Sequence, residues 1–366
     1  MQRLQSELAS RHRALGSNLE DWIGVGTAWT YDADACDEHD AVRERAGLFD
    51  VTGLMKVWVT GPDALAVVDH VITRDMTKIG PGRSAYGAVL TEEGTITDDA
   101  IIACFAEDRY LVAHGSGHCL DMLHQSARGK DVKIEHTDQI QDVSLQGPKS
   151  LEVLDPHTPI NLAELKYFHQ VETTLFGIDV IISRTGYSGE RGYEVYSDRA
   201  DICEIWDKIL EAGKDAGVIP CSFECLDKIR IEAALLFYPY DINENITPWE
   251  VDLDFAVNID KGDFRGKDAL IAAKGNEKVK LVGLVVDHND LVGEGLDLLV
   301  NGEKVGSLNS STWSHRMGKC LALGHLPPGM TAVGTKVDVR SDEINTTAEV
   351  ASLSFYDPDK LRPRGK

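Results

Sequence analysis

The stretch from Arg184 to Glu194 concentrates residue types that can hold a planar ligand. Its eleven residues include three glycines, two tyrosines and two glutamates. The tyrosine rings offer flat faces, and Glu190 and Glu194 offer acceptors for a paired donor edge. Strand-forming residues flank the stretch on both sides, so the sequence predicts a glycine-shaped turn between strands, where polar groups often carry function. The alternative is an ordinary hairpin turn with exposed glutamates.

A second candidate is the pair Asp98-Asp99, inside a run at 95–103 that predicts a strand. Neighbouring residues of a strand face opposite sides, so one of the two carboxylates must point to a packed or pocket side. A carboxylate there costs free energy unless it is paired. The pair therefore either lies on the surface without a role or includes a functional carboxylate.

The sequence offers little for a metal ion. His114, His118 and Asp121 could be read as ligands on helical spacing, but glycines between the histidines favour a polar loop and a helix cap. Cys221 and Cys225 are four residues apart and have no second pair, which argues against zinc. We therefore predict no metal site. The seven cysteines are scattered, as expected for reduced thiols of a cytoplasmic protein.

Length and charge narrow the class of protein. The 366 residues predict two or three domains, since single cores rarely grow past about 250–300 residues. Lys+Arg 37 against Asp+Glu 60 gives a formal charge of −23, which argues against nucleic acid or an anionic membrane surface as partner. The N-terminus lacks the apolar core of a secretory signal. No apolar run reaches the roughly 20 residues needed to span a bilayer.

The pattern of predicted secondary structure changes near residue 278. Before it, strand-like runs alternate with amphipathic helices, including predicted helices at 201–213 and 223–236. After it, short strand-like runs alternate with turns, which predicts a separate all-β domain, a sandwich or small barrel. The polar stretch 273–277 is the expected linker.

Several motifs, taken in order, resemble the aminomethyltransferase family, whose namesake is the tetrahydrofolate-dependent T-protein of the glycine cleavage system. They are Glu38-His39-x-Ala41-Val42-Arg43 with 47–51, Gly94-x-Ile96-x-Asp98-Asp99, Gln146-Gly147-Pro148, the stretch 184–194, Arg230-Ile231-Glu232-Ala233 and Lys261-Gly262-Asp263-Phe264-x-Gly266. Each is weak alone, whereas their order and spacing are specific. The resemblance covers nearly the whole chain and is closer to the branch of folate-dependent demethylases and dimethylglycine dehydrogenase folate domains.

The resemblance implies an α+β, three-lobed fold with folate in a central hole and a C-terminal β-barrel. It divides the chain into folate-binding lobes at 1–53 plus 138–272, an inserted lobe at 54–137 that carries the aspartate pair, and the barrel at 278–366. Tetrahydrofolate is the implied cofactor. The implied partners are a small methylated substrate and, for a true T-protein, a lipoyl carrier protein.

The resemblance also assigns roles to residues. Glu194 matches the glutamate that grips the pterin, because a carboxylate accepts two bonds from its amino group and ring N–H. The matching catalytic aspartate is Asp99 or Asp98; counting from Tyr86 favours Asp99, with an electrostatic role at the folate nitrogens that accept the carbon unit. The remaining matches on the cofactor side are Tyr187, Tyr86, Tyr167 (Phe168 if the alignment slips by one) and Arg230, for which a surface ion-pair ladder is the alternative.

Departures from the T-protein pattern shape the expected substrate. The pattern has an arginine before the aspartate of the helix that ends Arg-Leu-Glu, and this chain has Leu226; it has an asparagine where this chain has His114. Trp249 and Tyr240 could build an aromatic wall for a methylated cation, or pack as ordinary loop residues. Arg316 could bind a substrate carboxylate or the folate tail, or lie on the surface. Together with His114, these residues are the candidates for substrate binding.

Three functions follow from these observations. The first is an enzyme that moves a methyl or methylene group from a small methylated compound to tetrahydrofolate. The second is a glycine cleavage aminomethyltransferase. The third is a folate-binding accessory protein without transferase chemistry, whose relatives carry a cysteine where this chain has Asp263.

Overall fold

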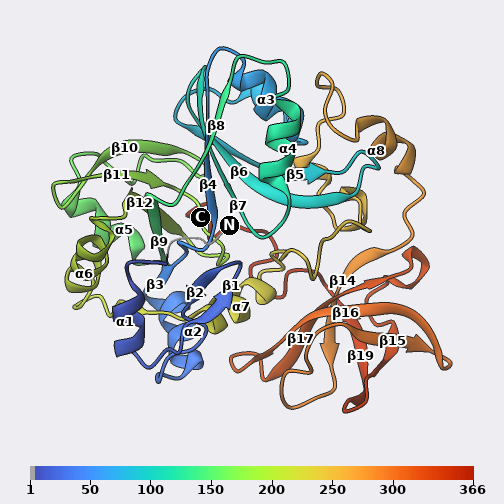
Figure 1. Cartoon of the computed structure of the whole chain (residues 1–366). Coiled ribbons are helices and arrows are strands. Elements are labelled where there is room, and N and C mark those ends of the chain that lie inside the picture. The colour runs from blue at the N-terminus through green and yellow to red at the C-terminus, as the bar shows by residue number, and fades with distance from the viewer. Residues whose placement is uncertain (1–4) are drawn as a thin grey trace.

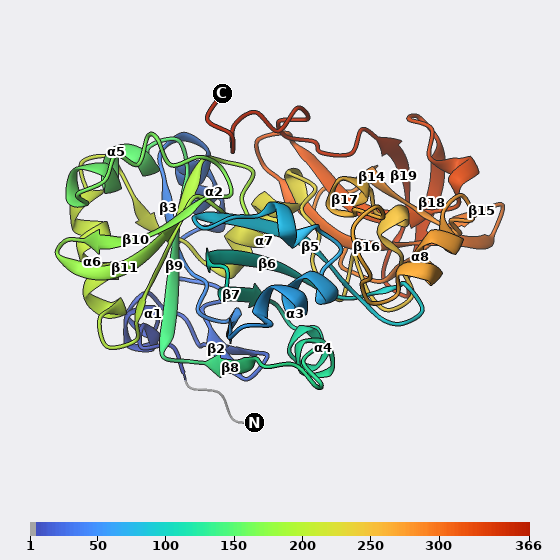
Figure 2. The same ribbon diagram turned by 90° about the horizontal axis from the view of Figure 1, so that it is seen from above.

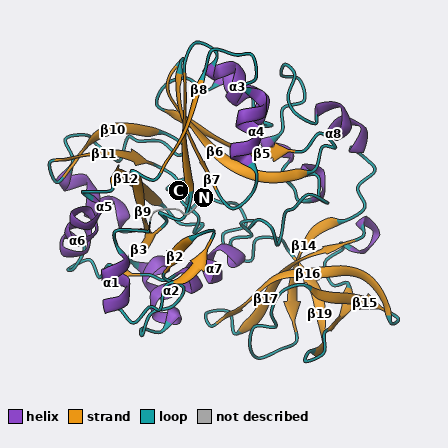
Figure 3. Ribbon diagram, in the orientation of Figure 1, coloured by secondary structure: helices purple, strands orange, loops and turns teal. Residues whose placement is uncertain are grey.

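The computed structural model describes residues 5–366, which form two open sheets and one closed barrel (Figure 1). Residues 1–4 of the predicted first lobe lie outside the described residues. A hairpin of β1 (Glu20–Trp22) and β2 (Val25–Thr27) adds a small fourth sheet. Strands dominate the barrel, whereas helices cover the two open sheets (Figure 3).

The six-stranded sheet is antiparallel except for one parallel edge pair, β13 with β3. Its order is β10 (Gln170–Leu175), β11 (Ile178–Ser183), β12 (Gly192–Asp198), β9 (Ile140–Gln146), β3 (Gly47–Asp50), β13 (Ile219–Pro220). Its helices are α1 (Ala9–Ala14), α2 (Ala35–Glu44), α5 (Ser150–Leu154), α6 (Ile202–Ala212) and α7 (Phe223–Glu232), with η2 (Asp155–His157). Leu145, Tyr193 and Val195 share one buried cluster with Trp206 of α6, so one face of the sheet packs on helix.

The five-stranded sheet is antiparallel throughout and carries two helices. Its order is β5 (Arg83–Leu90), β6 (Ile96–Ala106), β7 (Arg109–His114), β4 (Met55–Thr60), β8 (Lys133–Thr137). The helices are α3 (Ala64–Val71) and α4 (Cys119–Ser126), with η1 (Met76–Lys78). Ala100, Ile102 and Val112 are buried in one cluster with residues of α3 and α4. Alternation along the strands turns the odd-numbered residues of β6 to the other face.

The last lobe is a closed six-stranded barrel. Its order is β14 (Lys280–Val286), β17 (Lys319–Leu326), β16 (Glu303–Ser314), β15 (Leu296–Val300), β18 (Lys336–Arg340), β19 (Asn345–Ala351). Leu284, Leu298 and Val339 are fully buried in its core. Along the chain, η3 (Pro248–Glu250), η4 (Asp254–Ala256) and α8 (Lys267–Ala273) come after the strands of the two open sheets and before the barrel. The short helix η5 (Pro328–Met330) lies within the barrel lobe.

Buried polar contacts join the lobes. Lys56 of β4 forms an ion pair with Asp142 of β9, and both side chains are at most 1% exposed. Arg230 of α7 donates to Ser310 Oγ of β16 over 2.9 Å, which ties the first lobe to the barrel. Breaking such a pair would leave an uncompensated buried charge, so these contacts fix how the lobes sit around the space between them.

The predicted α+β fold with a C-terminal barrel is confirmed. The helix predicted at 223–236 is shorter than expected, because α7 ends at Glu232. Ala234 takes a positive φ of 51°, and the amide of Leu235 bonds back to the carbonyl of Arg230 over 2.9 Å. This reversal ends the helix and directs the following loop to the space between the lobes.

Candidate functional site

A cavity of about 410 Å³ lies where the three lobes meet. Seen from above, the six-stranded sheet and the barrel lie on opposite sides, with α7 and strands of the five-stranded sheet between them (Figure 2). Both open sheets, the start of α7, the loop after it and the C-terminal segment contribute to the lining. Pockets of this size, apolar with a few convergent polar groups, are typical of small-molecule sites.

Asp99 is the ionisable group that β6 presents to this cavity. The phenol of Tyr86, on the neighbouring strand β5, donates to Asp99 Oδ2 over 2.9 Å. Burial raises the pKa of Asp99 to about 7, the charge of Asp98 adds to the shift, and the bond from Tyr86 opposes it. Near neutral pH this carboxyl therefore exchanges a proton readily, as an acid–base group must.

Asp98 lies on the opposite side of the same strand and is fully buried. Its Oδ2 accepts from His114 Nδ1 over 2.8 Å and from the amide of Cys119 over 3.0 Å, at the start of α4. Its Oδ1 accepts the amide of Asp99 over 2.9 Å. Strand alternation thus separates the pair: Asp99 reaches the cavity, and Asp98 holds the strand to the helix behind it.

His114 borders the cavity from the end of β7. It pairs in register with Ala100, so it shares the face of Asp98. Its Nδ1 is committed to Asp98, and within residues 5–366 its buried Nε2 has no hydrogen-bond partner.

Glu194 lies on β12, in the floor that the six-stranded sheet forms. Thr185 Oγ1 donates to its Oε2 over 2.5 Å and Tyr196 Oη over 3.2 Å. Burial raises the pKa of Glu194, and these two hydrogen bonds oppose the shift. Both bonds fall on Oε2, so in the described part of the chain Oε1 is left to accept from a ligand.

The turn at 184–194 has its shape because of Gln146. A Cβ on Gly186 or on Gly192 would lie 2.1–2.2 Å from the end of the Gln146 side chain, so a larger residue at either position would have to displace the Gln146 amide from its hydrogen bonds. Ser188 Oγ donates to Gln146 Oε1 over 2.7 Å. Glu190 instead turns away from the floor and accepts from Tyr356 Oη over 2.6 Å. The turn therefore places Glu194, and not Glu190, on the cavity.

Two further predicted cofactor residues, Tyr187 and Tyr167, line the same cavity. The Tyr187 phenol donates to the carbonyl of Leu236 over 2.5 Å, which fixes its ring against the loop after α7. The Arg184 guanidinium lies 5.9 Å from the centre of the Tyr167 ring. Phe168, the alternative to Tyr167, also borders the cavity.

Arg230 does not line the cavity, although the sequence suggested a cofactor contact. Its guanidinium is buried and engaged within the protein, with Asp227 Oδ1 at 2.7 Å, Asp241 Oδ2 at 2.5 Å and Ser310. Burial opposes the charge, but Asp227 and Asp241 outweigh burial and raise the pKa of Arg230. The residue links α7, the 237–241 loop and the barrel.

Three predicted substrate residues also lie off the cavity lining. Trp249 is 2% exposed and its indole N–H donates to the carbonyl of Leu270 over 2.7 Å, so it packs in the core. Tyr240 is 43% exposed and stacks on Phe237 at 5.8 Å. Arg316 pairs with Glu44 at 2.7 Å on the surface. None of the three forms the expected aromatic wall or carboxylate site in this structure.

Several other residues that line the cavity were not predicted from the sequence. Tyr196 lies two residues after Glu194 on β12, and period-two alternation would have found it. Trp22, Phe223 and Phe237 form an aromatic group with ring centres 5.5–6.3 Å apart. The C-terminal segment contributes Tyr356, Lys360 and Arg364 from far along the chain, which no local pattern could predict.

Comparison with known proteins agrees with this architecture. Residues 8–261 match the family model described as the GCVT N-terminal domain, and residues 280–357 match the glycine cleavage T-protein C-terminal barrel domain. The chain belongs to the glycine cleavage T-protein, or aminomethyltransferase, family. The two matched regions meet between residues 261 and 280, which includes the point near residue 278 where the predicted secondary structure changes.

Relatives within the family differ in what they are named for. The chain is 42% identical to a heme-dependent oxidative N-demethylase gamma subunit of Ectopseudomonas mendocina, over 99% of this chain and 98% of that protein. It is 34% identical to an aminomethyltransferase of Streptomyces avermitilis, over 95% and 96%. The crystal structure of glycine cleavage system aminomethyltransferase T from Bartonella henselae superposes with a TM-score of 0.90 at 25% identity, covering 97% and 98%.

The family match confirms the predicted resemblance, including its leaning to demethylase relatives. Across residues 5–366 the T-protein-family chain has no helix that is both long and apolar enough to cross a membrane.

Proposed function

We propose that this chain transfers a one-carbon unit from a small methylated compound to tetrahydrofolate bound in the central cavity. The observation that carries the proposal is Asp99: a half-buried carboxyl with a pKa of about 7 that shares one cavity with the open oxygen of Glu194. An acid–base group and an acceptor for a planar donor edge in one pocket are what such a transfer needs.

The lining fits the pterin part of a folate. Glu194 Oε1 is free to accept from an amino or ring N–H group, and a charged acceptor makes such bonds strong. Tyr187, Tyr167 and Tyr196 supply aromatic surface around that position. Tetrahydrofolate would supply the nitrogen nucleophile that accepts the carbon unit.

Asp99 has two tasks in this proposal. In its ionised form it stabilises positive charge on the donor, because a fixed carboxylate in a dry pocket acts through little screening. It then holds the proton that the attacking nitrogen releases. Tyr86 orients the carboxyl by donating to Oδ2, and in this proposal Oδ1 is the oxygen that meets the reacting groups.

The lining favours a demethylase over a glycine cleavage enzyme. Leu226, which stands where the T-protein pattern has an arginine, lies in the cavity wall, so the wall lacks that cationic contact. We propose that the donor is an N-methyl amine whose carbon is delivered by an amine-oxidising partner subunit, as the relative named an N-demethylase gamma subunit suggests. The seven unpaired cysteines support a cytoplasmic location.

A glycine cleavage aminomethyltransferase is the second candidate, since relatives named aminomethyltransferase cover 95% and 97% of the chain. It would require a lipoyl carrier protein as donor. A non-catalytic folate-binding role is the third, and the titratable Asp99 in the cavity weighs against it.

One experiment separates these functions. The protein is incubated with tetrahydrofolate and, in parallel, with methylated amines with and without an amine-oxidising subunit, with sulfonium and methoxy-aromatic compounds, and with an aminomethyl-lipoyl carrier. Mass spectrometry of the folate product then distinguishes methyl from methylene transfer. Product is expected with the methylated amines only when the amine-oxidising subunit is present. Product only with the lipoyl carrier would favour the second function, and folate binding without product in any arm would favour the third.

A further inference from the structure

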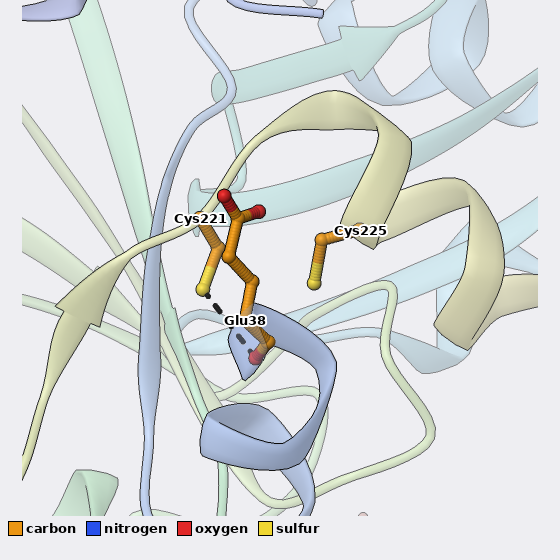
Figure 4. Close-up of side chains that lie close together, drawn as sticks. All are labelled: Glu38, Cys221 and Cys225. Carbon is orange, nitrogen blue, oxygen red and sulfur yellow. Dashed lines mark hydrogen bonds between the residues drawn. The ribbon is translucent and has the colours of Figure 1, made fainter. Parts of the chain in front are cut away.

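A buried cluster outside the cavity brings together Glu38, Cys221 and Cys225 (Figure 4). Glu38 comes from the first turns of α2, whereas the cysteines flank the start of α7. All three side chains are at most 2% exposed. One ligand atom from each lies within 4.8 Å of the other two. The Glu38 side chain runs between the two cysteines, and Cys221 Sγ lies 3.8 Å from its carbonyl oxygen.

One oxygen of the cluster is left unsatisfied. Glu38 Oε2 accepts from Ser222 twice, from the amide over 2.7 Å and from the hydroxyl over 2.6 Å. Oε1 is buried, and over residues 5–366 no donor reaches it. A buried carboxylate oxygen without a partner costs free energy, and more so when the group is charged. Native proteins rarely tolerate this cost unless an ion, water or proton meets the group.

The spacing of the cysteines alone argued against zinc, because no second pair accompanies them. The fold supplies what the spacing lacks. Ser222 caps α7, which places Cys221 just before the helix and Cys225 one turn into it on the same side. The bonds from Ser222 then hold the Glu38 carboxylate near the two cysteines, with one ligand atom of each within 4.8 Å, although Glu38 is 184 residues from Ser222 along the chain.

We propose that Glu38, Cys221 and Cys225 form a structural site for a thiophilic divalent cation, with Zn²⁺ as the best fit. Two thiolates and a carboxylate match the ligand preference of zinc, which takes sulfur and oxygen donors in tetrahedral geometry. The fourth position would be taken by water or by the Glu38 carbonyl oxygen that already faces Cys221. Binding releases one proton from each thiol, so the affinity must rise with pH.

The site would act on the fold and not on the reaction. It joins α2 to the start of α7, whose residues Phe223 and Leu226 form part of the cavity wall. A cation at the cluster would therefore stiffen that wall from behind. Asp98, His114 and Cys119 form a similar buried group, but both oxygens of Asp98 are already hydrogen-bonded, so it carries no such proposal.

The test uses the full-length protein, stripped with a chelator under reducing conditions and titrated with Co²⁺ as a spectroscopic substitute for zinc. We expect one equivalent to bind with a sulfur-to-cobalt charge-transfer band that Zn²⁺ abolishes. Added Zn²⁺ should raise the midpoint of thermal unfolding, because it binds only the folded site. Cys225→Ser and Glu38→Gln should each lose the band and the thermal shift, while Cys203→Ser, a cysteine on α6, should keep both.

Several results would overturn the proposal. Absence of the charge-transfer band in the folded wild type is one. Persistence of the band in Cys225→Ser is another, because cobalt would then be bound elsewhere. A Cys221–Cys225 disulfide in the protein as isolated, detected by mass spectrometry before reduction, would also replace the metal site. Glu38→Gln retains the side-chain shape and an acceptor for Ser222, so a fold defect is separable from ligand loss by circular dichroism.

Discussion

The two open sheets meet the cavity in different ways, although each packs its other face on helices. The five-stranded sheet presents Asp99, whose pKa lies at about 7 and whose protein partner in residues 5–366 is the Tyr86 phenol. The six-stranded sheet presents Glu194, held by Thr185 and Tyr196 within a rigid glycine turn. Asp99 can exchange a proton near neutral pH, whereas Glu194 is held in place to accept hydrogen bonds from a ligand.

This difference suggests a division of labour. The two donors on Glu194 oppose the rise of its pKa by burial and fix the orientation of the carboxyl group, which suits ligand binding. Leaving a carboxyl beside another negative charge, with a single donor, keeps its proton affinity near neutral pH, which suits chemistry. The Lys56–Asp142 pair joins the two sheets beneath the cavity and so holds the two carboxyls in fixed relation.

The largest effect is expected from Asp99→Asn. The change keeps the side-chain shape but removes the ionisable group, so the rate of carbon transfer should fall by roughly 10²–10³-fold, as for the loss of one preorganised transition-state contact. The dissociation constant of tetrahydrofolate should stay within about twofold. Single-turnover kinetics and isothermal titration calorimetry measure the two quantities.

Asp121→Asn, on the exposed face of α4, is the matched control and should leave both quantities unchanged. A fully active Asp99→Asn variant would remove the proposed role of this carboxyl. Loss of folate binding in Asp99→Asn would instead mean that Asp99 binds folate, so that the carboxyl groups of the two sheets would share one role.

Glu194→Gln is expected to have the second-largest effect, on binding. A neutral amide oxygen accepts a hydrogen bond more weakly than the charged carboxylate oxygen Oε1, so the dissociation constant of tetrahydrofolate should rise by roughly 10–100-fold, or about 1.5–3 kcal/mol. The transfer rate at saturating folate should change little. Glu190→Gln, next to the barrel lobe's Tyr356, is the control that should leave folate affinity intact. If Glu194→Gln bound tetrahydrofolate as tightly as the wild-type protein, Glu194 would not be the folate-binding carboxylate.

Much of the fold could be predicted because its signals are local. Alternation along β6 and β12, the glycines around residues 186–192 and the short strands after residue 278 each reflect a rule of neighbouring residues. The end of α7 could not, because Ala234 takes a positive φ only where the tertiary structure turns the chain back.

The candidate site divides in the same way. Asp99, Tyr86, Glu194, Tyr187 and Tyr167 lie on motifs that keep their residues close, and all of them line one cavity. Arg230, Trp249, Tyr240 and Arg316 lie off the cavity because each is held by other protein groups. The partners are the nearby Phe237 for Tyr240 and residues more distant along the chain for the other three: Ser310, Leu270 and Glu44. The metal cluster shows the converse, since its third ligand joins two cysteines only through the packing of α2 on α7.

The smallest expected effect is the pH dependence that separates the two sheets kinetically. With a pKa of about 7, Asp99 is mostly protonated at about pH 6 and mostly ionised at about pH 8, so the saturated transfer rate should rise about tenfold over this range if the ionised form is active. Asp99→Asn should lose this step. Burial also raises the pKa of Asp142, with Lys56 opposing the shift, but Asp142 lies near Glu194 and does not line the cavity.

Titration of Asp142 should therefore change the dissociation constant of tetrahydrofolate and not the saturated rate. Rates at saturating folate and binding constants measured across the same pH range distinguish the two groups. A rate that falls as pH rises would mean that the protonated form of Asp99 is the active one, and the carboxyl would then act as a donor. A flat rate with pH-dependent binding would place the titrating group in the floor, because only the ionisation of Asp99 should change the rate once the folate site is filled.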